Sequence, residues 1–200
     1  MTAYLTEPDT ALTVHDAIRR RRSPLAFADT PVPRELLQSL FEAARWSASS
    51  YNEQPWRFVV ATRENPEAYD ALLSAVNEKN RRWASRAPVL VGAITRTRFS
   101  GRERDNRHSG YDLGAAMATL TLQATEYDLY VHQMAGFSPE RLREVAGIPD
   151  EFEAMAMAAI GYRGDPADLP EDLRDRATRE RTRRSLEDTV FGLNWGEHPW

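Results

Sequence analysis

Four short apolar runs, separated by longer segments with a helical pattern, constrain the fold of this chain more than any other feature. Apolar runs of this length, bounded by polar, Gly or Pro residues, are typical of buried β-strands. The runs are Trp56–Thr62, Pro88–Thr95, Leu129–Met134 and Ala154–Gly161. Because two of the crossovers between them are long and helical, we expect an α+β fold with a central mixed, mostly antiparallel sheet of about four strands, flanked by helices.

Helical patterns fill the segments between these runs. They begin near a capping residue or a proline, at Thr13, Pro33, Pro66, Asp112 and Ser138. The third is predicted as one continuous helix over Pro66–Asn80. The fourth, Asp112–Asp128, is apolar nearly all round, which indicates a helix buried at the centre of the domain. Residues 97–110 are polar and contain several arginines and glycines, so we expect a mobile loop there.

Length and composition are those of one folded domain. The 200 residues suit a single domain, spanning 1–200, with one sizeable core. Hydrophobic residues make up 42% and charged residues 28%, which argues against wholesale disorder. The formal net charge of -4 argues against a dedicated nucleic-acid binder, because such proteins are usually basic.

Several function classes are disfavoured by residues that the chain lacks. With no cysteine, a disulfide, a thiolate nucleophile or a Cys-ligated metal is impossible, and the four histidines do not fall at a helical metal-ligand spacing. We therefore expect no metal site. No apolar run approaches the roughly 18–20 residues of a membrane span. The N-terminal MTAYLTEPDTALTV is acidic where a signal peptide is basic, so we expect a cytoplasmic location.

A run of four arginines, Arg19 to Arg22, is followed directly by Ser23. Adjacent guanidinium groups repel one another, and the planar Arg fork donates two parallel hydrogen bonds that suit a phosphate. Side chains on a helix point about 100° apart, so only two of the four could face one phosphate. The alternative is a solvated helix face, and this run alone does not decide between the two.

A second basic cluster, Arg-Glu-Arg-Thr-Arg-Arg over residues 179–184, favours the phosphate interpretation. In an extended segment Arg181 and Arg183 point to the same side, so clusters from opposite ends of an acidic chain could converge on one phosphate. A nucleic-acid patch is the rival interpretation. It is weakened because no aromatic residues interleave with these arginines and because carboxylates are interspersed among them.

The stretch Ala48-Ser-Ser-Tyr-Asn-Glu-Gln-Pro-Trp56 is the most specific in the chain. Its two carboxamides, Asn52 and Gln54, can each donate and accept hydrogen bonds. That capacity suits a heterocycle with adjacent N–H and C=O groups, such as the pyrimidine edge of a flavin. The alternative is a polar turn that satisfies its own backbone.

With these motifs in view, the chain resembles the nitroreductase family of FMN-dependent oxidoreductases from about Ala17 to Val190. The family's Arg-Arg-Ser phosphate element is present here and is followed four residues later by Phe27. The family's motifs appear as Arg21-Arg22-Ser23, as Ser49 through Trp56, as Asp112-Leu113-Gly114, as Gly136-Phe137 and as Gly147-Ile148-Pro149.

The resemblance implies a role for each matching position. The residues that would hold the FMN phosphate are Arg21, Arg22, Ser23, Arg181 and Arg183. Those that would line the ribityl chain and ring, in this family typically from the partner subunit, are Ser49, Ser50, Asn52 and Gln54. The backbone that would approach the isoalloxazine belongs to His132, Gln133, Met134, Ala135 and Gly136. His132 could equally be a hydrogen-bonded core histidine.

The resemblance also implies the chemistry. NADH or NADPH would pass a hydride to N5 of FMN, and an oxidised acceptor such as a nitroaromatic, quinone or enone would then take the electrons in ping-pong fashion. No catalytic side chain is expected. Two alternatives stay open: another reaction on the same flavin scaffold (dehydrogenation, reductive dehalogenation or flavin fragmentation), and a non-enzymatic flavin-binding or nucleic-acid-binding module.

Three aromatic residues are candidates for the substrate pocket over the flavin: Tyr51, Trp83 and Phe99, each of which could instead be ordinary packing. One position departs from the family pattern. Leu25 stands where the family often has a further arginine, so a phosphate contact is expected to be lost there, with Arg19, Arg20 or the C-terminal pair as possible replacements.

The C-terminal tail is highly charged from Leu169 and then turns aromatic at Phe191, Trp195 and Trp200. Aromatic side chains carried past the last strand need an apolar surface to cover them. We expect this extension to pack on a partner subunit, which makes the protein a homodimer, and the family resemblance implies that FMN lies at the subunit interface. The alternative is that the tail packs on its own domain.

Overall fold

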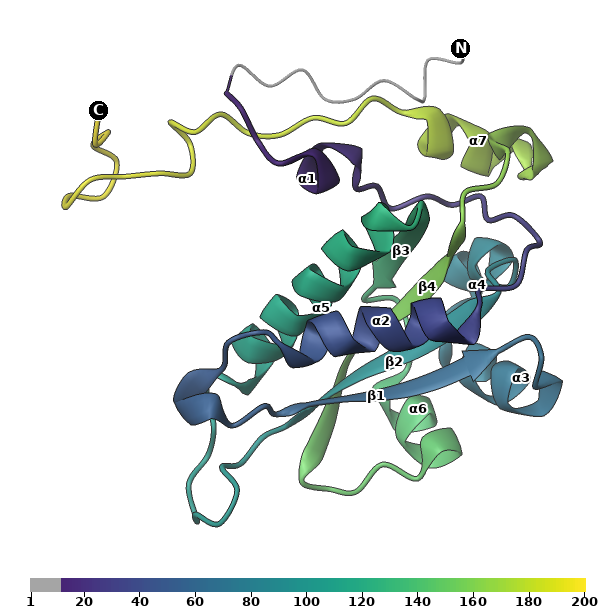
Figure 1. Ribbon diagram of the computed structural model, residues 1–200, viewed down its shortest axis with the longest axis horizontal. Coiled ribbons are helices and arrows are strands. Elements are labelled where there is room, and N and C mark those ends of the chain that lie inside the picture. The colour runs from purple at the N-terminus through teal and green to yellow at the C-terminus, as the bar shows by residue number, and fades with distance from the viewer. Residues whose placement is uncertain (1–11) are drawn as a thin grey trace.

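The computed structural model describes residues 12–200, so most of the acidic N-terminal stretch lies outside the described residues. One four-stranded sheet forms the centre, as predicted (Figure 1). Its strands are β1 (Trp56–Thr62), β2 (Val89–Arg96), β3 (Leu129–Met134) and β4 (Phe152–Tyr162). The strand order is β1-β2-β4-β3 and all three neighbouring pairs are antiparallel, so the prediction of a mixed sheet was wrong in that detail.

The connections explain why no neighbouring pair is parallel. Helices α3 (Pro66–Ala75) and α4 (Glu78–Ala84) join β1 to β2 and return the chain to the same end of the sheet. Helix α5 (Ser109–Glu126) instead runs about the length of the sheet, since 18 residues rise about 27 Å. Strand β3 therefore runs in the same direction as β2. Strand β4 lies between these two strands and is antiparallel to both.

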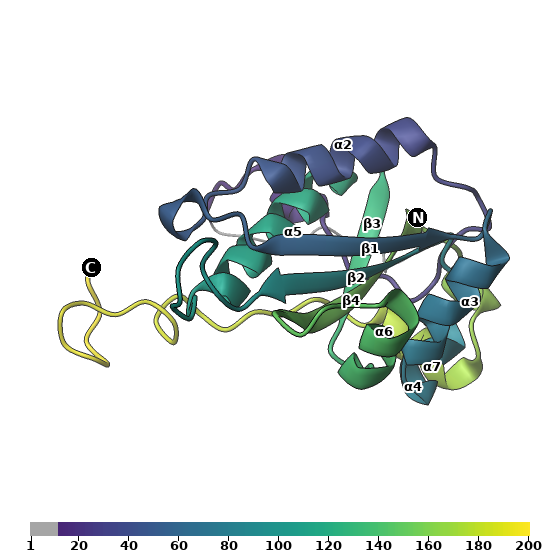
Figure 2. The same ribbon diagram turned by 90° about the horizontal axis from the view of Figure 1, so that it is seen from below.

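Helices cover both faces of the sheet (Figure 2). Helices α2 (Arg34–Arg45) and α5 pack on one face, and α3, α4 and α6 (Pro139–Ala146) pack on the other. Strand β2 shows why its sequence is a continuous apolar run: Leu90 and Ile94 enter one core cluster, whereas Val89, Val91 and Ala93 enter the other. Because both faces of the strand are buried, its sequence does not alternate between apolar and polar residues.

Two helix boundaries differ from the prediction. Helix α1 (Asp16–Arg20) begins after His15, whose Nδ1 accepts the N–H of Ala17 at 3.2 Å, and not at Thr13. The predicted helix over Pro66–Asn80 is two helices, because Val76 is extended and Asn77 caps α4 by accepting the N–H of Asn80. Asn is a favoured N-cap residue, so an Asn within a helical pattern can start a new helix, as Asn77 does here.

Helix α6 follows its capping signals closely. The Ser138 side chain accepts the N–H of Arg141, and Gly147 ends the helix at φ 61° in the left-handed region that glycine favours. The charged tail contains a helix that was not predicted, α7 (Glu171–Thr178), whose Leu173 is buried. Residues 97–108 form a small hairpin closed by a bridge between Arg98 and Asp105, which gives the expected mobile loop a defined structure.

After passing α1, the chain beyond α7 extends away from the domain body as an arm (Figure 1). Its apolar residues Leu193, Trp195 and Trp200 are 103%, 90% and 81% exposed. Phe191 and Trp195 contact each other, with ring centroids 4.7 Å apart. Packing on a partner subunit stays a prediction. Among residues 12–200, no helix is long and apolar enough to cross a membrane.

Candidate functional site

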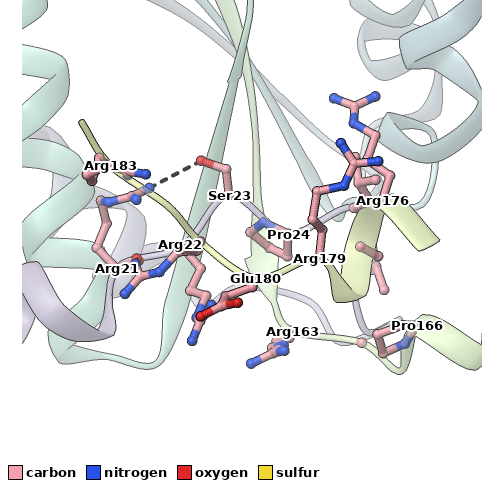
Figure 3. Close-up of a pocket in the computed structure, with 15 residues that line it drawn as sticks. Arg21, Arg22, Ser23, Pro24, Arg163, Pro166, Arg176, Arg179, Glu180 and Arg183 are labelled. Atoms are coloured by element: carbon pink, nitrogen blue, oxygen red, sulfur yellow. Dashed lines mark hydrogen bonds between the residues drawn. The ribbon is translucent and has the colours of Figure 1, made fainter. Parts of the chain in front are cut away.

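The main candidate site is a pocket of about 300 Å³ between the two ends of the chain, which we call the arginine pocket (Figure 3). Seven arginines line it, together with one carboxylate, that of Glu180. The arginines are Arg21, Arg22, Arg163, Arg176, Arg179, Arg181 and Arg183. The structure thus brings together all five residues predicted to hold a phosphate, since Ser23 lines the same pocket.

The N-terminal wall of the arginine pocket is held in place by backbone pairing and one apolar anchor. Helix α1 ends at Arg20, and Arg21 already has extended geometry, with φ -53° and ψ 130°. Further along, Gly164 donates its N–H to Ala26 O at 3.0 Å, which joins this segment to the end of β4. Leu25 is only 3% exposed and packs in the core. Leu25 also lines the pocket, so its apolar side chain anchors the wall to the core and offers no hydrogen-bond donor to an anion.

The C-terminal wall is tied to the first helix by Arg181. Its guanidinium donates to Arg21 O and, at 2.7 Å, to Arg19 O. These carbonyls lie at the end of α1, where helix carbonyls lack intrahelical partners. Arg181 therefore joins the segment that follows α7 to the end of α1. Arg183 lines the same pocket.

Arg20 does not contribute to the pocket. It makes ion pairs with Asp16 at 2.6 Å, Asp128 at 3.2 Å and Glu126 at 3.5 Å on the domain surface. With its charge already balanced by three carboxylates, Arg20 is a poor replacement for the contact expected to be lost at Leu25.

The electrostatics of the arginine pocket indicate an unbalanced positive charge. Burial, together with the neighbouring charges of Arg22, Arg21 and Arg183, lowers the pKa of Arg181 to about 10. Burial together with nearby arginines also lowers the pKa values of Arg21 and Arg22. A lowered pKa means that the environment opposes the positive charge. A bound anion would reverse that effect.

His132 links the pocket wall to the core. Its Nδ1 lies 2.7 Å from Pro24 O, directly after Ser23, so Nδ1 carries the proton and donates. The imidazole packs on Trp83, with ring centroids 4.2 Å apart. Burial lowers the pKa of His132, and the charges of Arg176 and Arg21 lower it further against the opposing hydrogen bond. His132 is thus a neutral, hydrogen-bonded histidine that supports Pro24.

The residues after His132 complete the edge strand β3 at Met134 and then leave the sheet. Gln133 donates to Thr121 Oγ1 on α5 at 3.4 Å, Met134 is buried in the core, and Ala135 is exposed. Gly136 accepts the N–H of Asn77 at 3.1 Å, and a Cβ at this position would lie 2.4 Å from the Asn77 Nδ2 atom. Because β3 is an edge strand, one row of its backbone N–H and C=O groups faces away from the sheet.

The stretch from Ser49 to Gln54, which we call the carboxamide loop, is held by its own hydrogen bonds. Ser49 Oγ accepts the N–H of Gln54 at 3.0 Å, and the Gln54 amide donates to Asn52 Oδ1 at 3.1 Å. The buried carboxylate of Asp112, at the start of α5, accepts the N–H of Ser50 at 3.1 Å. The Asp-x-Gly motif thus has a defined task, which is to anchor this loop.

The backbone of the carboxamide loop is strained. Tyr51, Asn52 and Gln54 have φ values of 54°, 56° and 49°, in the left-handed region that non-glycine residues rarely adopt. Such conformations cost of the order of 1–3 kcal/mol each and cluster at functional sites. The strain supports a functional role over that of a simple polar turn.

The carboxamide loop and the arginine pocket are far apart within one chain. Figure 1 shows the loop between α2 and β1 at the end of the sheet remote from α1 and α7. No residue of the loop lines the arginine pocket. The structure therefore separates the two halves of the predicted FMN site within this chain.

The three aromatic candidates have different surroundings. Tyr51 is 75% exposed, and its ring meets that of Phe99 edge-on, with centroids 5.8 Å apart. Phe99 is 5% exposed beneath it. Trp83 is 0% exposed and its ring contacts those of His132 and Phe27, so within this chain it is a core residue.

Three lining arginines were not predicted: Arg163, Arg176 and Arg179. Arg163 follows β4 directly, and its bridge with Phe27 brings it to the pocket. Arg176 lies on the unpredicted helix α7. A basic residue at the exposed end of a buried strand was a usable signal for Arg163. Among residues 12–200, no group of three potential ligands is placed to hold a metal ion.

Comparison with known proteins agrees with this architecture. The family model named "Nitroreductase family" matches residues 18–162. A solved oxidoreductase containing FMN is 33% identical, covers 94% of this chain and 96% of its own, and superposes with a TM-score of 0.89. An NADH dehydrogenase of Thermus thermophilus is 28% identical in an alignment 177 residues long, which covers 73% of this chain and 84% of that protein.

A third relative is an uncharacterized 15.4 kDa protein of Mycolicibacterium smegmatis. It is 33% identical over 146 residues, which are 70% of this chain and 97% of that protein. The family model spans both the Arg-Arg-Ser segment and the carboxamide loop, and the fold of the solved relative extends over nearly the whole chain. This chain therefore belongs to the nitroreductase family.

Proposed function

We propose that the protein is an FMN-dependent oxidoreductase that transfers a hydride from NADH or NADPH, through N5 of the flavin, to an oxidised acceptor such as a nitroaromatic, quinone or enone in a ping-pong mechanism. The observation that carries the proposal is the arginine pocket. Seven arginines facing one carboxylate, three of them with lowered pKa values, form a site that gains stability when an anion binds.

The pocket residues would have different roles in binding FMN. Arg21, Arg22 and Arg183, with the Ser23 hydroxyl, would donate to the phosphate. Arg181 would act mainly by fixing the C-terminal wall, since two of its N–H groups already bind backbone carbonyls. Pre-set donors of this kind cost little reorganisation when the ligand arrives.

The edge of β3 and the turn after it would face the ring. FMN, when bound, supplies the atom that accepts and releases the hydride. The chain supplies position, exclusion of water and N–H donors from Gln133 to Gly136 toward the electron-rich pyrimidine edge of the ring. His132 stays outside this chemistry, because its donor binds Pro24 O and its ring packs on Trp83.

We further propose a homodimer with FMN at the subunit interface. A pocket of about 300 Å³ lies at the lower end of the roughly 300–1,000 Å³ range of ligand sites, so it can hold the phosphate end of FMN but does not enclose the whole cofactor. The ring then needs a cover from elsewhere. The carboxamide loop has the right chemistry, but lies at the far end of its own chain, so the loop of a second subunit would provide this cover. Sedimentation of the purified protein tests the dimer; a monomer that binds FMN fully would contradict it.

Flavin uptake tests the function directly. We expect the purified protein to carry flavin absorbance or to gain it with added FMN, and we expect NADH or NADPH to bleach that absorbance under anaerobic conditions. A protein that stays colourless with excess FMN would refute the proposal. A flavoprotein that neither donor bleaches would point instead to a dehydrogenation, dehalogenation or fragmentation reaction on the same scaffold.

A further inference from the structure

We propose that the connection between β2 and α5, residues 97–108, together with Arg96 at the end of β2, binds an anionic group, a phosphate or a carboxylate, on a molecule that reacts at the flavin. The inference rests on the proposed function and extends it to the class of reactant. Two sources of such an anion are the 2′-phosphate of NADPH and an acidic electron acceptor.

The first observation is a pair of unsatisfied donors. Among residues 12–200, two buried side-chain polar atoms have no hydrogen-bond partner, Arg96 Nε and Asn106 Nδ2. Both are N–H donors, and they lie at the two ends of this one connection. A buried donor without an acceptor is costly, and native proteins rarely tolerate one. Arg96 lines a cavity on one side of the hairpin and Asn106 lines the neighbouring cavity, so the unsatisfied donor of Arg96 marks the first cavity as a place for an acceptor.

The second observation is a defined support for these donors. The connection is a hairpin in which Phe99 N donates to Arg104 O at 3.0 Å and Asn106 N donates to Thr97 O at 2.7 Å. Gly101, at its tip, has φ 67°, which glycine adopts without strain. A hydrogen-bonded hairpin presents its side chains in a reproducible arrangement.

The third observation is the presentation of the arginines. Residues 96–107 contain five of them, and Arg96, Arg98 and Arg102 line a cavity of about 350 Å³. The Arg102 guanidinium lies over the Tyr51 ring at 5.6 Å, and that of Arg104 lies over Phe99 at 5.8 Å. Stacking uses the flat face of a guanidinium and leaves its in-plane N–H groups available for an anion.

Four carboxylates near the hairpin cancel this charge only in part, because residues 96–107 carry five arginines. Asp105 lies 3.8 Å from Arg98, and Glu53 accepts the N–H of Ser100 at 2.6 Å. Hydrogen bonding with Ser100, together with the charges of Arg96 and Arg102, lowers the pKa of Glu53. Glu103 and Glu151 line the cavity beside its three arginines, so an anion must bind on the arginine side.

The connection lies where it can reach a reactant. It touches the carboxamide loop through the Tyr51–Phe99 ring contact and through the Ser100–Glu53 hydrogen bond. If that loop covers the flavin of the partner subunit, this hairpin stands beside the space in which donor and acceptor bind. Binding of the anionic group would then determine which donor or acceptor molecules react at the flavin.

Steady-state kinetics of the holoenzyme tests the proposal with Arg102→Gln, which removes charge from an exposed position at the cavity. Two matched pairs are compared: NADPH with NADH against a neutral quinone, and 4-nitrobenzoate with 4-nitrobenzamide at saturating donor. We expect kcat/KM for the anionic member of one pair to fall about 10- to 100-fold in Arg102→Gln, the scale of a lost charge-assisted hydrogen bond. The neutral member should change little.

The control is Arg82→Gln, a surface arginine paired with Asp172 away from this region, which should leave all four values unchanged. A fall for NADPH assigns the anion to the donor, and a fall for nitrobenzoate assigns it to the acceptor. Equal changes in both members of both pairs would overturn the inference while leaving the flavin function intact. Failure to bind FMN would remove the proposed function, and this inference with it.

Discussion

The arginine pocket and the carboxamide loop differ in how their polar groups are satisfied. The pocket concentrates like charges, and burial with mutual repulsion lowers the pKa values of Arg21, Arg22 and Arg181, so the free pocket is electrostatically incomplete. The loop satisfies its polar groups internally through Ser49 and Gln54 and carries strain in its backbone instead. The first region needs a ligand to balance it. The second is shaped in advance for one.

If the two regions form one site shared between subunits, mixing two different inactive variants should restore activity. We expect an Arg22→Ala/Arg183→Ala chain and an Asn52→Ala/Gln54→Ala chain each to lose most flavin-dependent activity alone. Refolding them together should restore up to about a quarter of the wild-type sites, because half of the randomly paired dimers carry one intact site.

The measurement is NAD(P)H-dependent reduction of a quinone before and after mixing. Self-mixing of each variant is the control. Without recovery in mixtures shown to contain heterodimers, both regions would have to serve the same chain, and the dimer proposal would fail.

The support behind the arginine pocket should be the most sensitive structural element. We expect Trp83→Ala to reduce the free energy of unfolding by about 3–5 kcal/mol, the usual cost of truncating a buried tryptophan. Tyr51→Ala, at an exposed ring of the carboxamide loop, should cost far less. Urea unfolding of both variants checks this. A small effect at Trp83 would contradict its place in the core.

The pocket arginines should affect FMN affinity more than stability. We expect Arg22→Ala or Arg183→Ala to weaken FMN binding by about 1.5–3 kcal/mol each, the scale of a charge-assisted hydrogen bond. Arg20→Ala, whose guanidinium pairs with surface carboxylates, is the matched control and should leave affinity unchanged. FMN titration of the apo-variants measures the effect; unchanged affinity in both pocket variants would place the phosphate elsewhere.

The smallest expected effect is a pH dependence from His132. Burial lowers its pKa in the folded state, so the unfolded chain binds this proton more readily. Its contribution to stability is therefore present above the ordinary histidine pKa of about 6.5 and is lost as the pH falls below that value. Urea unfolding of wild type and His132→Gln at several pH values measures this. Parallel pH profiles for the two proteins would contradict it.

Much of the fold could be predicted because its signals are local. All four strands were found from short apolar runs, and α6 from a capping serine and a terminal glycine. The break between α3 and α4 was missed because the apolar pattern continues through Asn77, whose capping role shows only when Val76 pairs with Phe137 across the fold. The five predicted phosphate ligands meet in one pocket, but the part that Arg181 plays in holding the chain ends together has no local signature.

By itself, the sequence determined the strands, most helix positions, the two arginine clusters and the carboxamide loop, because periodicity, capping and residue chemistry act over a few neighbouring residues. Only the tertiary structure decided the all-antiparallel strand order, the burial of Leu25 and Trp83, and the recruitment of Arg163 to the pocket. Each of these depends on contacts between residues far apart in the chain. Such contacts follow from how the whole core packs, which no single segment encodes.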